Sequence, residues 1–450
     1  MSHSGGNGVL TSKALTKIQS IILIVIIVFA SVAIGLIYIL FDGQNQPSKT
    51  IKIGILADSD GAIGKHVWQS AVLAAEHLNA EGGILGKQIQ VVGEDSDEET
   101  SRDLTKISFA LSRLLTLHDV DFVLGSGSGE KGYMIQDLSA EHKKILISYG
   151  GSEEGLTQRV IEDYDKYKYY FRYLRGNTSY VIREVIDGLL LAREITGFNN
   201  IGYLADDSGW NAEIREELDY VLPEVYGFNL VYKGKFPPHS TIDFSSYFEA
   251  AEEAEVEILF PLSLYDSGII VVKEYFDRQS PMILFGGMLI VASLLEGWER
   301  TDGKCVYTTM NVHCANIGYP ITSKILPFYN SYIERWGEAP SNHGAGSYDI
   351  IRFVLSDALE RAGTTETEEV IKALEETVVE TTLARKFAFT SSHDVFYGES
   401  ISNPDDYGHI NSLFQWLEDG SLVPIYPKWL MEEARATYIY PPWEGPWDKQ

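Results

Sequence analysis

The chain has 450 residues, 45% of them apolar, and is therefore long enough for two domains with substantial cores. Lysine and arginine number 36 against 64 aspartate and glutamate residues, which gives a formal net charge of −28. Such an acidic surface excludes nucleic acid and anionic lipid as electrostatic partners. It is typical of a soluble acidic protein, and a halophilic or acid-exposed habitat is the alternative interpretation.

The first element predicted along the chain is a membrane helix. Residues 21–41 form an apolar segment long enough to cross a bilayer core of about 30 Å. Lys13 and Lys17 precede it and no basic residue follows before Lys49, which predicts that the body of the protein lies outside the cytoplasm. A cleaved signal peptide is the competing interpretation. The apolar run continues past Ala33, where cleavage would fall, and this favours an uncleaved anchor.

An α/β pattern follows the membrane segment. Residues 51–56 predict a buried strand, residues 67–78 repeat apolar side chains at helical spacing, and residues 89–92 predict a second strand. A strand, a helix and a strand form a right-handed crossover, so the sheet should be parallel. Further strands are predicted at residues 121–125, 144–148, 200–205, 256–260, 282–285 and 306–309, and helices at residues 101–117, 180–196, 211–221, 244–255, 265–278, 324–336 and 347–362. These elements predict two doubly wound lobes, each with a central parallel sheet.

Four segments carry a resemblance to a known family. They are IKIGILAD from Ile51, LAAEHLNAEGGILGKQIQVVGEDSD from Leu73, FVLGSGSGEKG from Phe122 and ILISYGGSEEGLTQ from Ile145. The chain resembles the leucine/isoleucine/valine-binding proteins, the extracytoplasmic solute receptors of ABC importers, which have the type I periplasmic-binding fold. This resemblance covers residues 51 to about 440. It implies two lobes joined by three hinge crossings, with a small solute bound in the cleft between them.

Pattern and resemblance together predict a division of the chain. The parts are a cytoplasmic N-terminus (1–20), a transmembrane anchor (21–41), a linker (42–50), lobe 1 (51–170 plus 312–386), lobe 2 (171–311 plus 387–430) and a C-terminal strap (431–450). The hinge crossings are expected near residues 167–174, near Asn311 and near residues 387–390.

The two cysteines, Cys305 and Cys314, leave two alternatives open. An oxidising compartment favours a disulfide. The residues between them predict an extended strand, which over this length spans about 30 Å, far more than a disulfide bridges. A bridge would therefore require a hairpin bend near Asn311.

The first candidate site is the glycine-rich loop GSGSGEKG, residues 125–132. Its glycines match GxGxxG, but a dinucleotide site also needs an acidic residue at the end of the next strand, and that strand ends in Ser148 and Tyr149. No nucleotide cofactor is therefore expected. The backbone N–H groups at this helix start should instead attract an anion such as a carboxylate, at Gly129 and Glu130.

The second candidate loop follows the next strand and contains Tyr149, Gly150, Gly151 and Ser152. Two loops at neighbouring carboxyl ends form a crevice. The resemblance places Ser152 on a hydroxyl that holds the ligand and Gly150 on a backbone contact. It also places Gly129 where branched-chain receptors have a serine. The alternative for Ser152 is that it caps the following helix, whose first turn would hold two glutamates.

Further ligand contacts are expected from the second lobe. Trp210 matches a position where the family places an aromatic ring over the ligand, and Tyr265 lies near another such position. Met288 stands where branched-chain receptors have a glutamate that pairs with the ligand ammonium. Either Asp266 or one of Asp206 and Asp207 then replaces this glutamate, or the ligand is not a plain α-amino acid.

Metal and catalytic sites are not expected. The acidic clusters at Asp58 and Asp95 lack the spacing of a calcium loop and predict solvated loops. No residues combine a nucleophile with its base. The sequence predicts a membrane-anchored, extracytoplasmic receptor that binds an amino acid, or an amide or urea-like analogue, and delivers it to an ABC transporter. A ligand-sensing ectodomain that signals through a partner membrane protein is the alternative.

Overall fold

The computed structural model describes residues 50–98, 104–127, 129–174, 177–237, 240–263, 267–286, 288–289, 297–396 and 402–449. The chain divides into two units, Met1–Thr50 and Ile51–Gln450. The predicted anchor at residues 21–41 and nearly all of the linker lie outside the described residues. Within those ranges, no helix is both long enough and apolar enough to cross a membrane.

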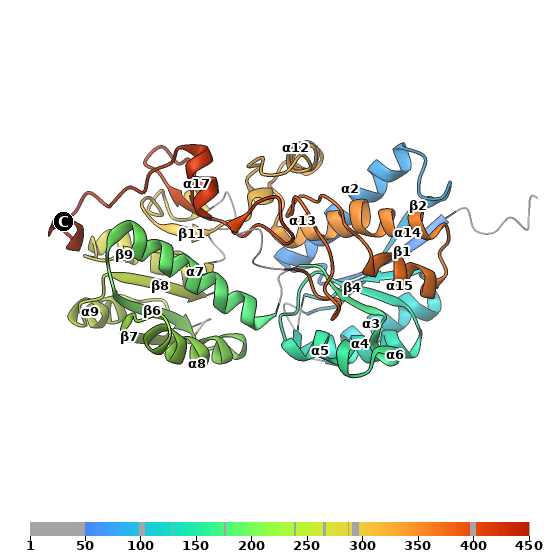
Figure 1. The fold of residues 1–450 in the computed structure, drawn as a ribbon, viewed down its shortest axis with the longest axis horizontal. Helices are drawn as coiled ribbons and strands as arrows, with labels where there is room; N and C mark the ends of the chain where they lie inside the picture. Colours follow the sequence, from blue (N-terminus) through green and yellow to red (C-terminus); the bar gives the residue numbers. More distant parts are fainter. Residues whose placement is uncertain are drawn as a thin grey trace, which may run out of the picture. The chain divides into compact units, whose positions relative to one another are not determined.

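The first sheet has five strands in the order β2-β1-β3-β4-β5 (Figure 1). They are β1 (Thr50–Ala57), β2 (Gln88–Asp95), β3 (Phe122–Leu124), β4 (Ile145–Ser148) and β5 (Tyr170–Arg172). The pairs β1–β3, β3–β4 and β4–β5 are parallel, which confirms the predicted parallel sheet. Because β2 and β3 lie on opposite sides of β1, the carboxyl ends of β1 and β3 meet at a topological switch point, where doubly wound folds bind ligands.

Helices cover both faces of this sheet. They are α2 (Ala62–Ala80), α3 (Leu104–Ser112), α4 (Gly129–Glu141), α5 (Glu154–Glu162) and α6 (Tyr164–Tyr167), with the π-helical turn η1 (Arg113–Leu117) after α3. Alternate residues of a strand point to opposite faces. Val123 and Leu146 accordingly pack with the buried side chains of α3, η1, α4 and α5. Phe122 and Ile145 pack with the cluster that contains the apolar face of α2.

The Asn-Ala-Glu-Gly-Gly turn after α2 has a clear physical cause. The Asn79 side chain donates to the Ile89 carbonyl (2.8 Å) and accepts from the Ile89 N–H (2.7 Å), so it joins the end of α2 to β2. Gly83 has φ of +81°, and a Cβ there would lie 2.0 Å from the Lys87 carbonyl oxygen. Only glycine fits a turn with both properties.

The second sheet has the order β10-β8-β6-β7, and β9 also pairs with β8. Its strands are β6 (Asn200–Asp206), β7 (Asn229–Phe236), β8 (Ile258–Ser263), β9 (Ile283–Leu284) and β10 (Met288–Leu289), and all four pairings are parallel. Its helices are α7 (Thr178–Thr196), α8 (Gly209–Glu224), α9 (Ser245–Glu253), α10 (Ser267–Arg278) and α11 (Gly297–Arg300). Ile201 and Tyr203 pack with α7 and α8, and Leu204 lies in the cluster that contains buried residues of α9 and α10.

The remaining chain adds helices to the first sheet and a small third sheet. The helical segments are η3 (Cys314–Asn316), α12 (Ile325–Trp336), α13 (Asn342–Asp349), η4 (Ile350–Leu355), α14 (Ser356–Ala362), α15 (Thr367–Glu375), α17 (Lys428–Ala434) and η5 (Pro446–Lys449). Helix α13 packs along α2 (Figure 1). The third sheet, β11 (Thr309–Asn311), β12 (Leu413–Trp416) and β13 (Leu422–Tyr426), is antiparallel and was not predicted. Beyond it, Trp443 packs on Tyr275 and donates to the Ser280 carbonyl (2.8 Å).

Cys305 and Cys314 are both buried and unpaired. Burial raises the pKa of the Cys305 thiol to about 11 and that of Cys314 to about 12, which keeps both in the unreactive thiol form at neutral pH. We expect a thiol titration of the denatured protein to give two thiols per chain both with and without prior reduction. A gain of thiols after reduction would show that the two cysteines pair.

Candidate functional site

The loops that follow β3 and β4 are in direct contact at the switch point of the first sheet. The Gly151 N–H donates to the Gly127 carbonyl (3.0 Å), and the Ser148 hydroxyl donates to the Ser126 carbonyl (2.8 Å). A Cβ on Gly150 would lie 2.7 Å from the Gly127 Cα, so the absence of a side chain allows this approach. The two glycine-containing loops that the sequence singles out therefore form one continuous wall.

A carboxylate of the chain itself binds to the β3 loop, two residues before the helix start at Gly129. Glu98, in the turn that follows β2, accepts from the Gly127 N–H (3.1 Å), from the Tyr149 hydroxyl (2.8 Å) and from the Ser126 hydroxyl. The Tyr149 ring is fully buried, so its hydroxyl is held at this place. Sequence reasoning did not identify Glu98, and the predicted anion site at Gly129 and Glu130 stays a prediction.

Lys131 of α4 binds the backbone at Glu98. Its ammonium donates to the Glu98 carbonyl (3.1 Å) and to the Asp97 carbonyl (3.4 Å), and the side chain is 5% exposed. A buried ammonium with backbone carbonyl partners holds a turn firmly, because releasing it would leave a charge without compensation. The acidic turn after β2 is thus tied to both α4 and the β3 loop.

Gly129, the first residue of α4, lies against a second carboxylate. A Cβ on Gly129 would fall 1.0 Å from Glu153 Oε2, so the Glu153 side chain takes the space that a serine would use at this position. Glu130 lies in the same helical turn, and its side chain is outside the described set. Burial and the nearby Glu153 charge both raise the pKa of Tyr133, one turn further along α4. The missing serine hydroxyl is thus accompanied by an added negative charge.

Ser152 lies at the junction between the β4 loop and α7. Its carbonyl accepts from the Thr178 N–H (2.9 Å) and the Thr178 hydroxyl (3.3 Å). The predicted alternative, that Ser152 caps the next helix, is wrong: α5 begins at Glu154, and its N-cap is Glu153. Gly151 has φ of +76°, in the left-handed region, and the helix begins only three residues later. A ligand-binding role for the Ser152 hydroxyl stays a prediction.

Arg172 at the end of β5 holds the β4 loop in place. Sequence reasoning did not identify this arginine. One guanidinium nitrogen donates to the carbonyls of Gly151 (2.7 Å) and Glu153 (3.0 Å). The others bind the Asp394 carboxylate at 2.8 and 2.5 Å, in a pair whose side chains are 0% and 2% exposed. The signal was available, because a lone arginine inside the aromatic run YKYYFRYL predicts a buried ion pair.

The same contacts bear on the predicted lobe boundaries. β5 belongs to the first sheet and includes Phe171 and Arg172, beyond the expected boundary at residue 170. The Arg172 N–H donates to the His393 carbonyl (2.9 Å), and Phe171 stacks on the His393 ring at 4.0 Å. His393, which the predicted division assigns to lobe 2, therefore packs on β5 of the first sheet. The division into lobes joined by three crossings stays a prediction.

The predicted contacts from the second sheet lie after the carboxyl end of β6, beside the carboxyl end of β8, or outside the described residues. Trp210 is in the first turn of α8 and Met288 begins β10, but their side chains are not described, and Tyr265 and Asp266 lie outside the described residues. Asp206 accepts from the Asn211 amide (2.9 Å), and Asp207 pairs with Arg215 (3.2 Å). Both aspartates proposed to replace the missing glutamate thus have partners at the start of α8.

The acidic loop after β1 is not a solvated cluster throughout. Asp58 is 1% exposed and accepts from the N–H groups of Asp60 (3.1 Å) and Gly61 (2.9 Å), so its carboxylate shapes the turn into α2. Asp95 accepts from the Ser59 N–H (3.0 Å). In the part of the chain that the structure describes, no group of three or more acidic, histidine or cysteine side chains could hold a metal ion.

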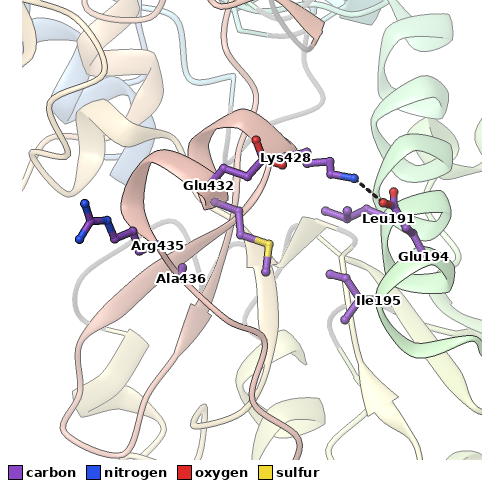
Figure 2. Close-up of a pocket in the computed structure, with 8 residues that line it drawn as sticks. Leu191, Glu194, Ile195, Lys428, Glu432, Arg435 and Ala436 are labelled. Carbon is purple, nitrogen blue, oxygen red and sulfur yellow. Dashed lines mark hydrogen bonds and ion pairs between the residues drawn. The ribbon is translucent and has the colours of Figure 1, made fainter.

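A surface hollow of about 340 Å³ lies between α7 and the segment of α17, and none of the predicted site residues lines it (Figure 2). It is lined by Leu191, Glu194, Ile195, Lys428, Met431, Glu432, Arg435 and Ala436. Lys428 donates to Glu194 (2.5 Å) across the hollow, as Figure 2 shows. This exposed ion pair joins the two helices at the surface.

Comparisons with known proteins agree with this fold. Residues 50–396 match the family model described as "Periplasmic binding protein". The chain is 20% identical to Leu/Ile/Val-binding protein homolog 7 of Brucella melitensis, over 86% of this chain and 94% of the relative.

Two solved structures are similar in fold. The branched-chain amino acid transporter substrate-binding protein LivJ from Streptococcus pneumoniae, in complex with isoleucine, has a TM-score of 0.65 at 18% identity and covers 83% of this chain and 97% of its own. The solute-binding protein of an ABC transporter from R. palustris, in complex with benzoate, has a TM-score of 0.63 at 13% identity, with 84% and 96% covered. The chain belongs to the leucine/isoleucine/valine-binding family of periplasmic binding proteins, whose members are solute-binding receptors of ABC transporters and not enzymes.

Proposed function

We propose that this chain is a membrane-anchored, extracytoplasmic receptor that binds one small polar solute, an amino acid or an amide or urea-like analogue, for an ABC importer. The observation that carries the proposal is the continuous wall formed by the β3 and β4 loops at the switch point. Trp210 follows the carboxyl end of β6, Met288 pairs with Leu262 near the carboxyl end of β8, and both would supply the facing wall. Closure of the two lobes by a hinge would hold the solute.

The anchored state rests on the apolar segment at residues 21–41 and on the lysines that precede it. Isolated membranes from cells that express the full chain give a direct test. We expect the protein to stay in the membrane fraction after high-salt and alkaline washing. We also expect protease to digest it when the protease is added to cells whose cell wall or outer membrane is opened but whose cytoplasmic membrane is intact. Release by the washes would contradict the anchor.

A thermal-shift screen of the full-length protein in mild detergent tests solute binding. The panel contains amino acids, amides, urea and short or aromatic carboxylic acids, including isoleucine and benzoate, the ligands of the two similar structures. A solute at 100 times its Kd should stabilise the protein by about 2.7 kcal/mol. A panel in which no compound raises the Tm would contradict the proposal.

Ser152→Ala should weaken binding of the best solute by about tenfold, equivalent to about 1.4 kcal/mol. Thr178 binds the Ser152 carbonyl and not its hydroxyl, so the Tm without solute should stay unchanged. Isothermal titration measures the affinity, and Ser246→Ala on the exposed face of α9 is the matched control. Unchanged affinity in Ser152→Ala would place the solute elsewhere.

A further inference from the structure

Two carboxylates that the chain itself provides lie at the first-sheet wall. Free N–H groups in a glycine loop favour negative charge. At the β3 loop that charge is Glu98, bound by Ser126, Gly127 and Tyr149. The second carboxylate is Glu153, which lies in the space beside Gly129, the first residue of α4. The two carboxylates come from different strand ends, after β2 and after β4, and meet the same short segment.

Both the side chain and the backbone of Glu98 are held by hydrogen bonds. Its carboxylate accepts from the Ser126 hydroxyl and the Gly127 N–H of the β3 loop and from the hydroxyl of the buried Tyr149 in the β4 loop. Its backbone is held by the buried Lys131 ammonium (3.1 Å to the Glu98 carbonyl). Moving Glu98 aside for an incoming carboxylate would therefore break contacts at the side chain and strain the turn. A solute carboxylate placed beside it would also be repelled by like charge in a partly desolvated site.

We propose that Glu98, supported by Glu153, replaces the solute carboxylate at this wall and makes the receptor select solutes that present hydrogen-bond donors there: amines, amides or amidines. This inference rests on the proposed function and specifies its ligand class. It also accounts for Met288 at the position where branched-chain receptors have a glutamate, because the negative partner for a solute ammonium or amide is then supplied by the opposite wall.

The first experiment needs no knowledge of the solute. Glu98→Ala leaves the donors of Ser126, Gly127 and Tyr149 around a space the size of a small carboxylate. Acetate at a concentration of about 100 mM should raise the Tm of full-length Glu98→Ala in detergent by several degrees more than chloride does. The wild-type protein and Glu217→Ala, which removes an exposed glutamate of α8, should show no such difference. An equal acetate effect in all three proteins would overturn the inference.

The second experiment compares matched probes by isothermal titration: isoleucine with isoleucinamide, and benzoate with benzamidine. The wild-type protein should bind the amide or amidine of a pair at least tenfold more tightly than the carboxylate. Glu98→Gln keeps the side-chain shape and should reduce that ratio about tenfold, whereas Glu217→Gln should leave it unchanged. If the wild-type protein binds the carboxylate of a pair more tightly, the inference is overturned. This comparison uses only the wild-type protein, so it holds even if Glu98→Ala does not fold.

The two experiments separate the inference from the proposed function. In one outcome, acetate specifically stabilises Glu98→Ala, but no probe and no solute of the wider panel binds. This outcome supports the assignment of Glu98 and contradicts the receptor function. In the other outcome, a solute binds, acetate does not specifically stabilise Glu98→Ala, and the ratio of amide to carboxylate affinity is the same in Glu98→Gln as in the wild type. This outcome supports the receptor function and overturns the assignment of Glu98.

Discussion

Arg172→Ala should lower the free energy of unfolding by about 3–5 kcal/mol, because it leaves the buried Asp394 carboxylate without its charged partner. It also removes the donors that hold the Gly151 and Glu153 carbonyls, so the β4 loop should lose its position. Solute affinity should then fall together with stability. Urea unfolding followed by circular dichroism measures the stability, and titration of the best solute below the transition measures the affinity.

An exposed ion pair provides the control for this prediction. Lys372 contacts Glu369 at 3.0 Å, with side chains that are 64% and 56% exposed. Lys372→Ala should cost no more than about 1 kcal/mol, because water replaces most of what an exposed ion pair contributes. If the two alanine variants were equally stable, the Arg172–Asp394 pair would not hold the loop in the way described.

The second large effect is a pH dependence that comes from Asp349. Burial raises the pKa of this carboxyl from its usual 3.8 to about 7, against the opposing effect of hydrogen bonds from Tyr173 and Thr382. The folded protein therefore binds a proton that the unfolded chain releases above pH 3.8. This stability is fully present below about pH 4 and is lost as the pH rises to about 7. At about 1.36 kcal/mol per pKa unit, the change amounts to about 4 kcal/mol.

His409 has the opposite dependence in an overlapping range. Burial lowers its pKa from 6.5 to about 3, so its contribution is present above pH 6.5 and is lost as the pH falls. The wild-type profile alone would mix the two groups. We therefore expect the stability of wild type relative to Asp349→Asn to fall by about 4 kcal/mol between pH 4 and pH 7, measured by urea unfolding at each pH. A constant difference would show that Asp349 does not titrate in this range.

The parallel sheets could be predicted because their strands are short apolar runs separated by helical periodicity, and both signals are local. The third sheet could not, because β11 pairs with a strand about a hundred residues later, and β12 contains the polar Gln415. Two predicted helices also contain π-helical turns, at Arg113–Leu117 and Ile350–Leu355, which leave the apolar spacing nearly unchanged and have no signature in it.

Part of the candidate site could likewise be predicted from the sequence and part could not. Contact between the β3 and β4 loops follows from parallel strand order, and their glycines mark the close approach in the sequence itself. The contacts of Glu98 and Arg172 depend on how individual side chains reach from one strand end to another, which no periodic pattern records. The sequence predicts that the wall favours a negative charge, but the contact of Glu98 with it depends on the path of the turn after β2.

One small solute should bind at the wall formed by the β3 and β4 loops. Isothermal titration of the best panel solute into the full-length protein in detergent, beside the Ser152→Ala and Trp210→Ala variants, tests this directly. We expect saturation at one solute per chain and an affinity at least tenfold lower in each variant. No saturable binding of any solute, or equal affinity in all three proteins, would contradict it.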